Sequence, residues 1–578
     1  MEFKINGNVI FHNEHYSCEQ LNRIENYILE VIKDYENNQI IALALSRTPM
    51  MLATIFALLK KGIPFLPLDI SLPEGRLSYM LDKAAIKTII SDSVSSVCGI
   101  STKMVSSDTR IILKQDQNYQ KEHNNNIDDE NIAYILYTSG STGLPKAVEV
   151  LRHGLINFIE GISESVQFES DCRIACLTNM SFDIFFLESV LALQKGMTVV
   201  LADDRERNNP RLIRKLIVNN CVNTMQCTPS LIRMMQMIDP DLTFLNNIKI
   251  LMLGGEPLPK TMLYSIQKVL SGKIYNMYGP TETTIWSTVS NLTNADNVNI
   301  GKEIKNTEVF IVDDNLNMVG EGEEGEILIA GAGLARRYLN DDEKTKKSFI
   351  TITNKNKLIR VYRTGDYGYR DLSGTLFCTG RKDNQVKVLG HRIELGDVEH
   401  HIGRIQNIEN NVVVANPNDN NRLVCFYLSK HTMADSNLRK EALKYLPDYM
   451  IPESWIRVPS LLYTSSGKVD RKEMLSIYMY NTETVLESEL SQVLSQGNDT
   501  YENDILNKII ECFNIDYDGI SSETEIELLG LDSLTYVTCL VNVEDLFDIE
   551  FEDEMLLNDF FKTIGDIEDF VKTKIENN

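Results

Sequence analysis

Residues 132–150 read IAYILYTSGSTGLPKAVEV. The first six residues are apolar or aromatic and predict a buried strand, and the Thr, Ser and Gly residues after it lead to Pro145-Lys146. Small residues let main-chain N–H groups approach a polyphosphate closely, and a lysine at the end of such a loop neutralises phosphate charge. The Gly-x-x-Gly-x-x-Lys spacing differs from that of a Walker A loop, and a polar surface loop is the alternative interpretation. The stretch therefore predicts a phosphate-binding loop that follows a strand.

The sequence on both sides of this loop alternates short apolar runs with longer amphipathic ones, from Gln39 to about Gly279. The apolar runs predict buried strands at 40–46, 63–69, 87–92, 173–179, 197–202, 223–229, 248–255 and 273–279. Longer segments between them, such as 229–238 and 257–270, predict helices. Alternation of this kind is typical of parallel sheets covered by helices, so we expect an α/β fold.

The pattern changes after Asn297. Residues 307–314, 325–331 and 374–380 are strand-like and separated by Gly, Asn and Asp turns, which predicts a β-rich part. Residues 384–475 have the pattern of a small α+β unit, 481–500 form a polar stretch, and 501–578 contain three helical patterns. We therefore expect a large subdomain at 1–382, a small α+β subdomain at 383–480, a linker at 481–500 and a helical bundle at 501–578.

The composition excludes several classes of protein. Of the 578 residues, 43% are hydrophobic and 24% charged, which excludes a wholly disordered chain. The net charge of −25 argues against nucleic-acid binding through phosphate contacts, and residues 501–578, with 21 acidic residues and 4 lysines, indicate a separate acidic module. Ten scattered cysteines without a Cys-x-x-Cys pair predict reduced thiols.

Two further observations concern location and metal binding. The first 15 residues lack the features of a signal peptide, and the apolar run from Met50 to Leu59 is too short to span a bilayer. We therefore expect a cytoplasmic protein that binds no membrane. His12, His15 and Cys18 have a metal-like spacing but lack a fourth ligand, and a surface loop in an unstructured start is the preferred interpretation.

Further motifs follow one another along almost the whole chain. They are LLKKGIPFLPLD (58–69), SFDIFF (181–186), NMYGPTE (276–282), GEILIAGAGLARRYL (325–339), YRTGDY (362–367), GRKDNQVKVLGHRIELGDVE (380–399), LPDYMIP (446–452), SGKVDR (466–471) and GLDSL (530–534). With the loop at 137–146, these motifs and their order resemble the adenylation domains of nonribosomal peptide synthetases, within the acyl-adenylate-forming enzymes, followed by a peptidyl carrier domain.

The resemblance implies a two-step ligase. ATP and an amino acid would give an aminoacyl adenylate and pyrophosphate, and the aminoacyl group would then move to 4′-phosphopantetheine on the carrier. Residues that the resemblance assigns to ATP are Thr138, Ser139, Gly140, Ser141, Thr142, Gly143, Lys146, Asn276, Tyr278, Gly279, Thr281, Asp366 and Arg381. Tyr278 offers an aromatic face for adenine, Glu282 offers a carboxylate for Mg²⁺, and Asp366 can accept from the ribose hydroxyls.

Three more residues receive catalytic roles from the resemblance. Lys468 would bridge the substrate carboxylate and the α-phosphate, although an exposed loop lysine is usually only solvated. Asp383 would be the hinge about which the small subdomain moves between two catalytic positions. Ser533 would carry 4′-phosphopantetheine, although a serine at the start of a helix is often only an N-cap.

The resemblance also implies a substrate pocket. Asp183 would hold the α-ammonium, although it could instead cap a helix at 184–194. The remaining pocket positions, with Lys468 at the carboxylate, are Ile184, Leu187, Gln226, Leu251, Leu253, Met277, Ile285 and Trp286. Seven of these eight side chains are large and apolar, and the set is close to the family's glycine signature, from which it departs at Leu253 and Met277. We expect glycine as the substrate and alanine as the next best.

The expected partners follow from the same resemblance. A phosphopantetheinyl transferase would modify Ser533, and a downstream condensation or other tailoring enzyme would take the loaded product. Two alternatives stay open at this stage. One is an acid–CoA ligase of the same superfamily, which would not need Asp183, and the other is a catalytically silent scaffold that presents the acidic carrier.

Overall fold

The structure is a computed structural model, and its described residues divide into two compact units. The first unit contains residues 1–138 and 145–384, and the second contains 139–144 and 385–578. Each unit is considered by itself. The residues that the structure describes are 2–37, 39–106, 109–114, 128–140, 144–169, 171–381, 385–388, 391–416, 422–431, 433–462, 469–476, 502–513, 521–529, 533–547, 549–552, 555 and 560–577.

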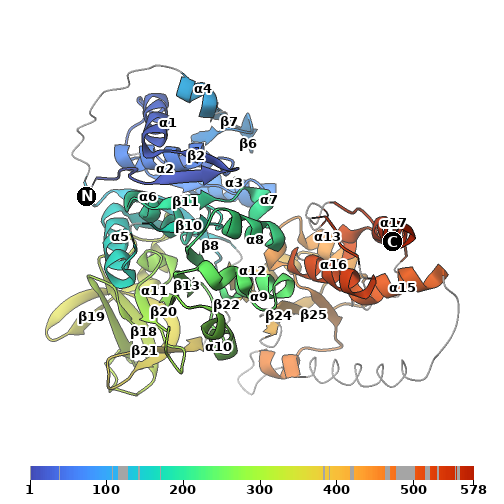
Figure 1. The fold of residues 1–578 in the computed structure, drawn as a ribbon. Helices are drawn as coiled ribbons and strands as arrows, with labels where there is room; N and C mark the ends of the chain where they lie inside the picture. The colour runs from blue at the N-terminus through green and yellow to red at the C-terminus, as the bar shows by residue number, and fades with distance from the viewer. Residues whose placement is uncertain are drawn as a thin grey trace. The chain divides into compact units, whose positions relative to one another are not determined.

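Two mainly parallel sheets form the body of the first unit (Figure 1). The seven-stranded sheet has the order β6 (Ser96–Val97), β7 (Ile100–Met104), β5 (Thr88–Ser91), β3 (Ile41–Ala44), β4 (Phe65–Pro67), β8 (Ile132–Thr138), β9 (Lys146–Leu151). The nine-stranded sheet has the order β16 (Lys302–Glu303), β15 (Thr288–Asn291), β14 (Lys273–Tyr278), β13 (Ile250–Gly254), β12 (Thr224–Cys227), β10 (Arg173–Cys176), β11 (Thr198–Leu201), β1 (Asn8–Phe11), β2 (Glu14–Tyr16).

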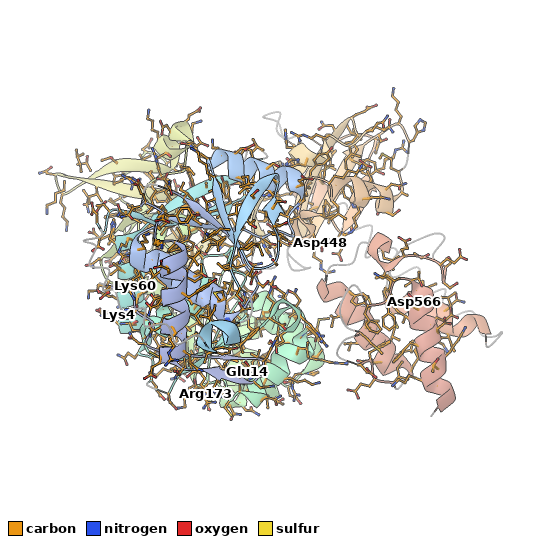
Figure 2. All side chains as sticks on the ribbon, turned by 90° about the horizontal axis from the view of Figure 1, so that it is seen from above. Lys4, Glu14, Lys60, Arg173, Asp448 and Asp566 are labelled. Atoms are coloured by element: carbon orange, nitrogen blue, oxygen red, sulfur yellow. The ribbon has the colours of Figure 1, made fainter. Side chains whose placement is uncertain are left out.

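A layer of helices shares one apolar core with both sheets. Its members are α1 (Cys18–Val31), α2 (Pro49–Lys61), α5 (Arg152–Val166), the π-helix η1 (Leu187–Leu191) and α6 (Ala192–Gln194). Helix α2 is apolar around most of its circumference because it is buried from Pro49 to Leu59, as its sequence predicts. Its Lys60, labelled in Figure 2, pairs with the buried Glu25 of α1 at 3.1 Å.

Other helices cover the outer faces of the two sheets. One separate core joins the nine-stranded sheet to α8 (Pro210–Asn219), α9 (Pro229–Ile238) and α10 (Lys260–Val269). Another joins the seven-stranded sheet to α3 (Glu74–Lys83). Because strand side chains alternate between faces, the central strands contribute one set of residues to the inner core and the other to an outer core.

An antiparallel sheet completes the first unit, as the change of pattern after Asn297 predicts. Its path is β17 (Thr307–Val312), β18 (Gly325–Gly331), β20 (Lys357–Arg370) and β19 (Phe349–Asn354), and β21 (Leu376–Arg381) pairs with β20. A short helix, α11 (Asp342–Ser348), precedes β19. Strand β20 matters for the site because it carries Asp366 opposite Arg381 of β21.

The second unit contains two separate apolar cores of α+β structure and one of helices. The α+β elements are β22 (Gln385–Val388), β23 (His391–Glu394), α12 (Leu395–Ile402), β24 (Asn410–Asn416), β25 (Arg422–Leu428), α13 (Asp435–Ala442), η4 (Asp448–Met450) and β26 (Ser454–Arg457). The helical elements are α15 (Glu502–Phe513), η5 (Ile526–Leu529), α16 (Ser533–Phe547) and α17 (Ile564–Asn577). A capping box starts α17, in which Asp566 (labelled in Figure 2) and Thr563 exchange hydrogen bonds.

The sequence predicts most of these elements. All eight expected strands between Gln39 and Gly279 form, as do the three expected helices of the 501–578 bundle. The expectation of an unstructured start is wrong, because β1 pairs with β11 and a Ser17 capping box begins α1. All ten cysteines are free thiols. Among the helices that the structure describes, none is both long and apolar enough to cross a membrane.

Candidate active site

Asp366 is the centre of a polar group at the edge of the antiparallel sheet. The Tyr278 hydroxyl, at the end of β14, donates to Asp366 Oδ2 at 2.6 Å, and Arg381 Nη1 donates to Asp366 Oδ1 at 2.8 Å. Burial raises the pKa of the Tyr278 phenol well above its usual range, and the Asp366 charge adds to the rise. The Tyr278 phenol therefore stays protonated and donates. Tyr278 and Asp366, which the resemblance assigns to adenine and ribose, are thus direct hydrogen-bond partners.

Lys146 and Glu282 form a buried ion pair, with Nζ and Oε1 2.8 Å apart and side-chain exposures of 7% and 0%. The Tyr338 hydroxyl lies in the same group, 3.2 Å from Lys146 Nζ and 2.7 Å from Glu282 Oε1. The phosphate-loop lysine and the carboxylate expected for Mg²⁺ are thus direct neighbours. Tyr338 is a residue that the sequence reasoning missed, although it belongs to the quoted motif at 325–339.

The first residues of the predicted phosphate loop are only partly described. Thr138 ends β8, and its buried Oγ1 has no hydrogen-bond partner within the part of the chain that the structure describes. Ser139 belongs to the second unit, where its hydroxyl donates to the Arg392 main-chain oxygen at 2.6 Å. Gly140 is buried, whereas Ser141, Thr142 and Gly143 lie outside the described residues. The orphaned Thr138 hydroxyl is suited to a phosphate oxygen.

The remaining ATP residues follow β14. Asn276 is buried and its amide donates to the Asn299 main-chain oxygen at 2.8 Å. Thr281 begins the 3₁₀ turn η3 (Thr281–Thr283) that carries Glu282. Gly279 has a steric reason to be glycine, because a Cβ there would lie 2.5 Å from the Ile285 oxygen. The backbone after Tyr278 therefore folds tightly back toward the segment that holds Trp286.

Trp286 follows two residues with left-handed backbone, Thr284 at φ 62° and Ile285 at φ 70°. Such a backbone is strained in a β-branched residue and is found where the surrounding structure imposes it. The Thr284 hydroxyl donates to the Gly333 main-chain oxygen at 2.6 Å. The indole of Trp286 is 2% exposed, and its Nε1 donates to Gln226 Oε1 at 2.9 Å.

Six of the expected pocket residues lie in, pack against or hydrogen-bond with members of the inner core. Gln226 of β12 donates from Nε2 to the Ile184 main-chain oxygen and to Glu188 Oε1, both at 3.1 Å. The apolar members of this group, which lie in or against the inner core, are Ile184, Leu187, Met277, Ile285 and Trp286. The structure thus brings together six of the expected pocket positions.

Leu251 and Leu253 lie apart from Trp286 in the structure, and their place in the substrate pocket stays a prediction. Both belong to the outer core with α9 and α10, on the opposite face of β13 from Trp286. Their neighbours Met252 and Gly254 take the inner face, and a Cβ at Gly254 would lie 2.6 Å from the Trp286 ring. The physical reason is the two-residue period of a strand, because a shift of one residue moves every side chain to the other face. Because β13 reads ILMLG and is buried on both faces, no signal in its sequence distinguishes the two faces.

Asp183 lies in the turn before η1, and its main-chain oxygen accepts from Phe186 N at 3.0 Å. Its charge adds to the burial that raises the pKa of Tyr134, so the two side chains are electrostatic neighbours. The helix expected at 184–194 forms partly as π-helix, Leu187–Leu191, whose N-cap is Phe186. π-Helical turns of this kind are frequent at functional sites.

Three predicted residues cannot be placed in this way. Asp383 and Lys468 lie outside the described residues. Ser533 is the first residue of α16, and its side chain is outside the described part. The His12, His15 and Cys18 pattern does not converge, because Cys18 Sγ donates to the Ile5 oxygen while His12 Nε2 lies 2.7 Å from Asp203 Oδ2. Asp203 and Glu206 also form the capping box of α7 (Asp204–Arg207).

Comparison with known families now separates the two parts of the chain. Residues 7–339 match the model of the AMP-binding enzyme family, and residues 503–571 match that of the phosphopantetheine attachment site. The first match contains Tyr278, the Lys146–Glu282 pair and Trp286, whereas Asp366 and Arg381 lie beyond it. The second contains all of α16, which begins at Ser533.

Known relatives and solved structures show the same combination. The chain is 35% identical over 465 residues to a dimodular nonribosomal peptide synthase of Bacillus subtilis (strain 168) and 32% identical over 454 residues to malpinin synthetase of Mortierella alpina. These matches cover 79% and 76% of this chain, but the chain spans only 19% and 6% of the length of those relatives.

One solved structure is an NRPS protein containing adenylation and PCP domains, bound to a vinylsulfonamide inhibitor. It superposes with a TM-score of 0.80 at 22% identity, over 98% of this chain and 94% of that one. At this identity the likeness establishes the fold. The chain therefore belongs to the AMP-binding enzymes, as an adenylation domain joined to a peptidyl carrier domain of the nonribosomal peptide synthetase type.

Proposed function

We propose that the chain activates glycine with ATP to glycyl adenylate and pyrophosphate, and then loads the glycyl group on a phosphopantetheine thiol at Ser533. Alanine is the expected second-best substrate. The observation that carries the glycine proposal is the Trp286 wall, held by Gln226 on one side and packed against Gly254 on the other. A large ring fixed in this position leaves little volume for a substrate side chain.

The placement of Leu253 and Gly254 bears on the proposed pocket. A departure from the family's glycine signature was expected at Leu253, but Leu253 belongs to the outer core. Gly254 takes the inward position of β13, so the departure at Leu253 concerns no inward-facing residue. Asp183 would hold the α-ammonium and Lys468 the carboxylate, which leaves Ile184, Gln226 and Trp286 to limit the size of the side chain.

The adenylation step needs positioned charges rather than a covalent nucleophile on the protein. Thr138 and Lys146 would bind phosphate oxygens, since the buried Thr138 hydroxyl has no partner among the described residues. Tyr278, Asp366 and Arg381 would hold adenosine. Glu282 would hold Mg²⁺, which when bound neutralises phosphate charge. The buried Glu282 carboxylate suits this ion because it is an oxygen ligand that accepts from Lys146 and Tyr338, which keeps it ionised.

The loading step would use the second unit. The chain divides between Asn384 and Gln385, next to the proposed hinge Asp383, which supports subdomains at 1–382 and 383–480. A linker at 481–500 and a carrier at 501–578 complete the proposed organisation. Ser533 begins α16, and the N-terminus of a helix favours an attached phosphate diester. A phosphopantetheinyl transferase would supply this group, and a condensation or other tailoring enzyme would receive the glycyl thioester.

A pyrophosphate-exchange panel on the full chain tests the proposal. Glycine should support the fastest exchange, and alanine should follow at a ratio of about 10–200-fold, the range that one methylene gives in an apolar pocket. Faster exchange with leucine, phenylalanine or an aryl acid would overturn the glycine proposal. Exchange with fatty or aryl acids and not with amino acids would favour an acid–CoA ligase, and exchange with none would favour a silent carrier scaffold.

A further inference from the structure

Glu188 is a completely buried carboxylate that none of the proposed steps uses. It lies on η1, next to Leu187, with 0% of its surface exposed. Four donors converge on it: the main-chain N–H groups of Leu177 and Thr178 on Oε2, at 2.8 and 2.9 Å, and the Thr178 hydroxyl and Gln226 Nε2 on Oε1, at 2.6 and 3.1 Å. A carboxylate with four donors and no acceptor is suited to its ionised form.

Arg47 supports this charge from the segment after β3. It is 5% exposed and donates to the main-chain oxygens of Cys176, Thr178 and Ala202, at the ends of β10 and β11. Burial raises the pKa of Glu188, whereas the Thr178 and Gln226 hydrogen bonds and the Arg47 charge oppose that rise. Glu188 is thus part of a buried polar network rather than an isolated charge.

Gln226 can take only one amide orientation in this network. Trp286 Nε1 is a donor and requires the Gln226 oxygen, while the Ile184 main-chain oxygen is an acceptor and requires the Gln226 nitrogen. The second N–H of that nitrogen points to Glu188. The chain of contacts from Glu188 through Gln226 to the indole is therefore directional at every link.

The other side of the Trp286 ring is set by packing. The ring lies where a Cβ at Gly254 would clash with it at 2.6 Å, so it occupies space that a side chain at 254 would otherwise fill. Packing limits how far the ring can advance, and the Gln226 hydrogen bond limits how far it can rotate away. The volume left for a substrate side chain then depends on whether Gln226 itself is held.

We propose that Glu188 is a positioning residue for amino-acid selection, which holds Gln226 and through it fixes the Trp286 indole as the wall of the substrate pocket. The inference rests on the proposed amino-acid pocket and adds the residue that keeps its size constant. Loss of the Glu188 link should admit alanine more readily, because the ring can then tilt away from the substrate.

Glu188→Gln is the sharpest variant, because it preserves size and disturbs one link in particular. If the amide nitrogen of the new side chain replaced Oε2, it would face the main-chain N–H groups of Leu177 and Thr178, which are donors too. At the Oε1 position the Thr178 hydroxyl can rotate to accept from it, and only Gln226 loses its partner. The variant should therefore keep the main-chain contacts and release Gln226. Glu25→Gln is the matched control, since Glu25 is also buried, at 1% exposure, but pairs with Lys60 away from these residues.

The readout is the ratio of kcat/KM for glycine to that for alanine in pyrophosphate exchange. In Glu188→Gln the ratio should fall about tenfold, the factor that one hydrogen bond of ordinary strength accounts for. In Glu25→Gln it should stay at the parent value. A Glu188→Gln variant that loses activity or stability but keeps the parent ratio would overturn the proposal, because a merely structural residue acts in that way.

A double-mutant cycle adds a second criterion. Gln226→Met keeps the volume of the side chain and removes its hydrogen bonds. If Glu188 acts through Gln226, the double variant Glu188→Gln/Gln226→Met should have the same glycine-to-alanine ratio as Gln226→Met alone. If instead the double variant changes the ratio by the product of the two single-variant factors, the two residues act independently and the proposal is contradicted.

Fluorescence provides a measurement that does not depend on activity. The chain has two tryptophans, so Trp455→Phe leaves Trp286 as the single indole. In that background Glu188→Gln should shift the emission to longer wavelength and increase quenching by acrylamide, and Glu25→Gln should do neither. An unchanged spectrum would overturn the proposal.

The two proposals fail in different ways. If the parent prefers another amino acid to glycine, the glycine proposal fails, and the ratio is measured between that amino acid and its homologue with one more methylene. If the parent exchanges pyrophosphate with no acid, the proposed function fails, and the fluorescence of Trp286 still decides whether Glu188 holds the ring.

Discussion

The Lys146–Glu282 pair is a buried ion pair to which we also assign a proposed role in ATP binding. Both are buried, and each would be needed by a different part of the nucleotide complex. Removing one member of a buried ion pair leaves an uncompensated charge and typically costs about 3–5 kcal/mol, whereas replacing both is often tolerated. Stability and activity should therefore respond differently to single and double substitution.

We compare the single variants Lys146→Met and Glu282→Gln with the double variant that combines both substitutions. Lys146→Met should lower the free energy of unfolding by about 3–5 kcal/mol and abolish pyrophosphate exchange. The double variant should regain most of the stability without regaining activity. Urea denaturation and exchange measured on the same samples check both parts. A double variant as unstable as Lys146→Met, or one that is active, would contradict the assigned roles.

Lys468 is predicted from the resemblance alone to be the cation at the α-phosphate. Lys468→Ala should reduce adenylation by about 10²–10³, the typical loss of one preorganised charge in a transition state. Lys472→Ala, four residues along on an exposed helical turn, is the control and should retain parental exchange. Parental exchange in a folded Lys468→Ala variant would remove the residue from the mechanism.

At the scale of secondary-structure elements, Asp435 makes the start of α13 sensitive to pH. Burial raises the pKa of Asp435 from an ordinary 3.8 to about 6, against a smaller opposing effect of the Trp455 main-chain N–H. The folded state therefore holds the proton more tightly than the unfolded chain does. This group favours folding at low pH, and its contribution is lost as the pH rises from about 4 through about 6.

Asp435→Asn should remove that dependence, because an amide resembles the protonated acid at every pH. The variant should melt above the parent at pH 7.5, and the difference should nearly vanish at about pH 3.5, below the unfolded pKa. Calorimetry of the full chain at several pH values measures the melting temperature of the second unit in the parent and in the variant. An equal difference at both pH values would show that Asp435 does not titrate near 6.

Most strands of the two large sheets could be predicted from the sequence, whereas two elements of the fold could not. Apolar runs bounded by turn residues located β3, β4, β5 and β10 through β14, because burial on both faces leaves an unbroken apolar stretch. The hairpin β1–β2 was missed because its strands have only four and three residues, and the apolar run Val9–Phe11 is too short to give a strand pattern of its own. The π-helix at Leu187–Leu191 was missed because π and α turns share one apolar pattern.

The sequence motifs locate which segments the structure brings together, but not which face of a strand each side chain takes. Tyr278, Asp366, Arg381, Lys146 and Glu282 come together as their motifs suggest, although they come from segments far apart in the sequence. Leu253 was placed in the pocket although Gly254 faces Trp286. A motif fixes which strand contributes to a pocket, but only the packing of both faces decides which alternate residues point inward.

For the whole molecule, the central claim is that one chain performs both half-reactions. Tyr278, Glu282 and Asp366 belong to the first unit, whereas Lys468 and Ser533 belong to the second. The claim therefore requires the two units to act on the same aminoacyl group. This chain spans only a small part of the length of its relatives. The account therefore assigns it no step after the loading of the carrier. The loaded carrier is therefore the product that defines the chain's own contribution.

Intact-mass spectrometry of the full chain tests this claim most directly. The chain is first treated with a phosphopantetheinyl transferase and coenzyme A, and then with ATP, Mg²⁺ and glycine. The account predicts one phosphopantetheine addition and then one glycyl addition that requires ATP, and neither addition in Ser533→Ala. A phosphopantetheine addition in Ser533→Ala, or a modified parent chain that gains no aminoacyl group from any amino acid, would contradict it.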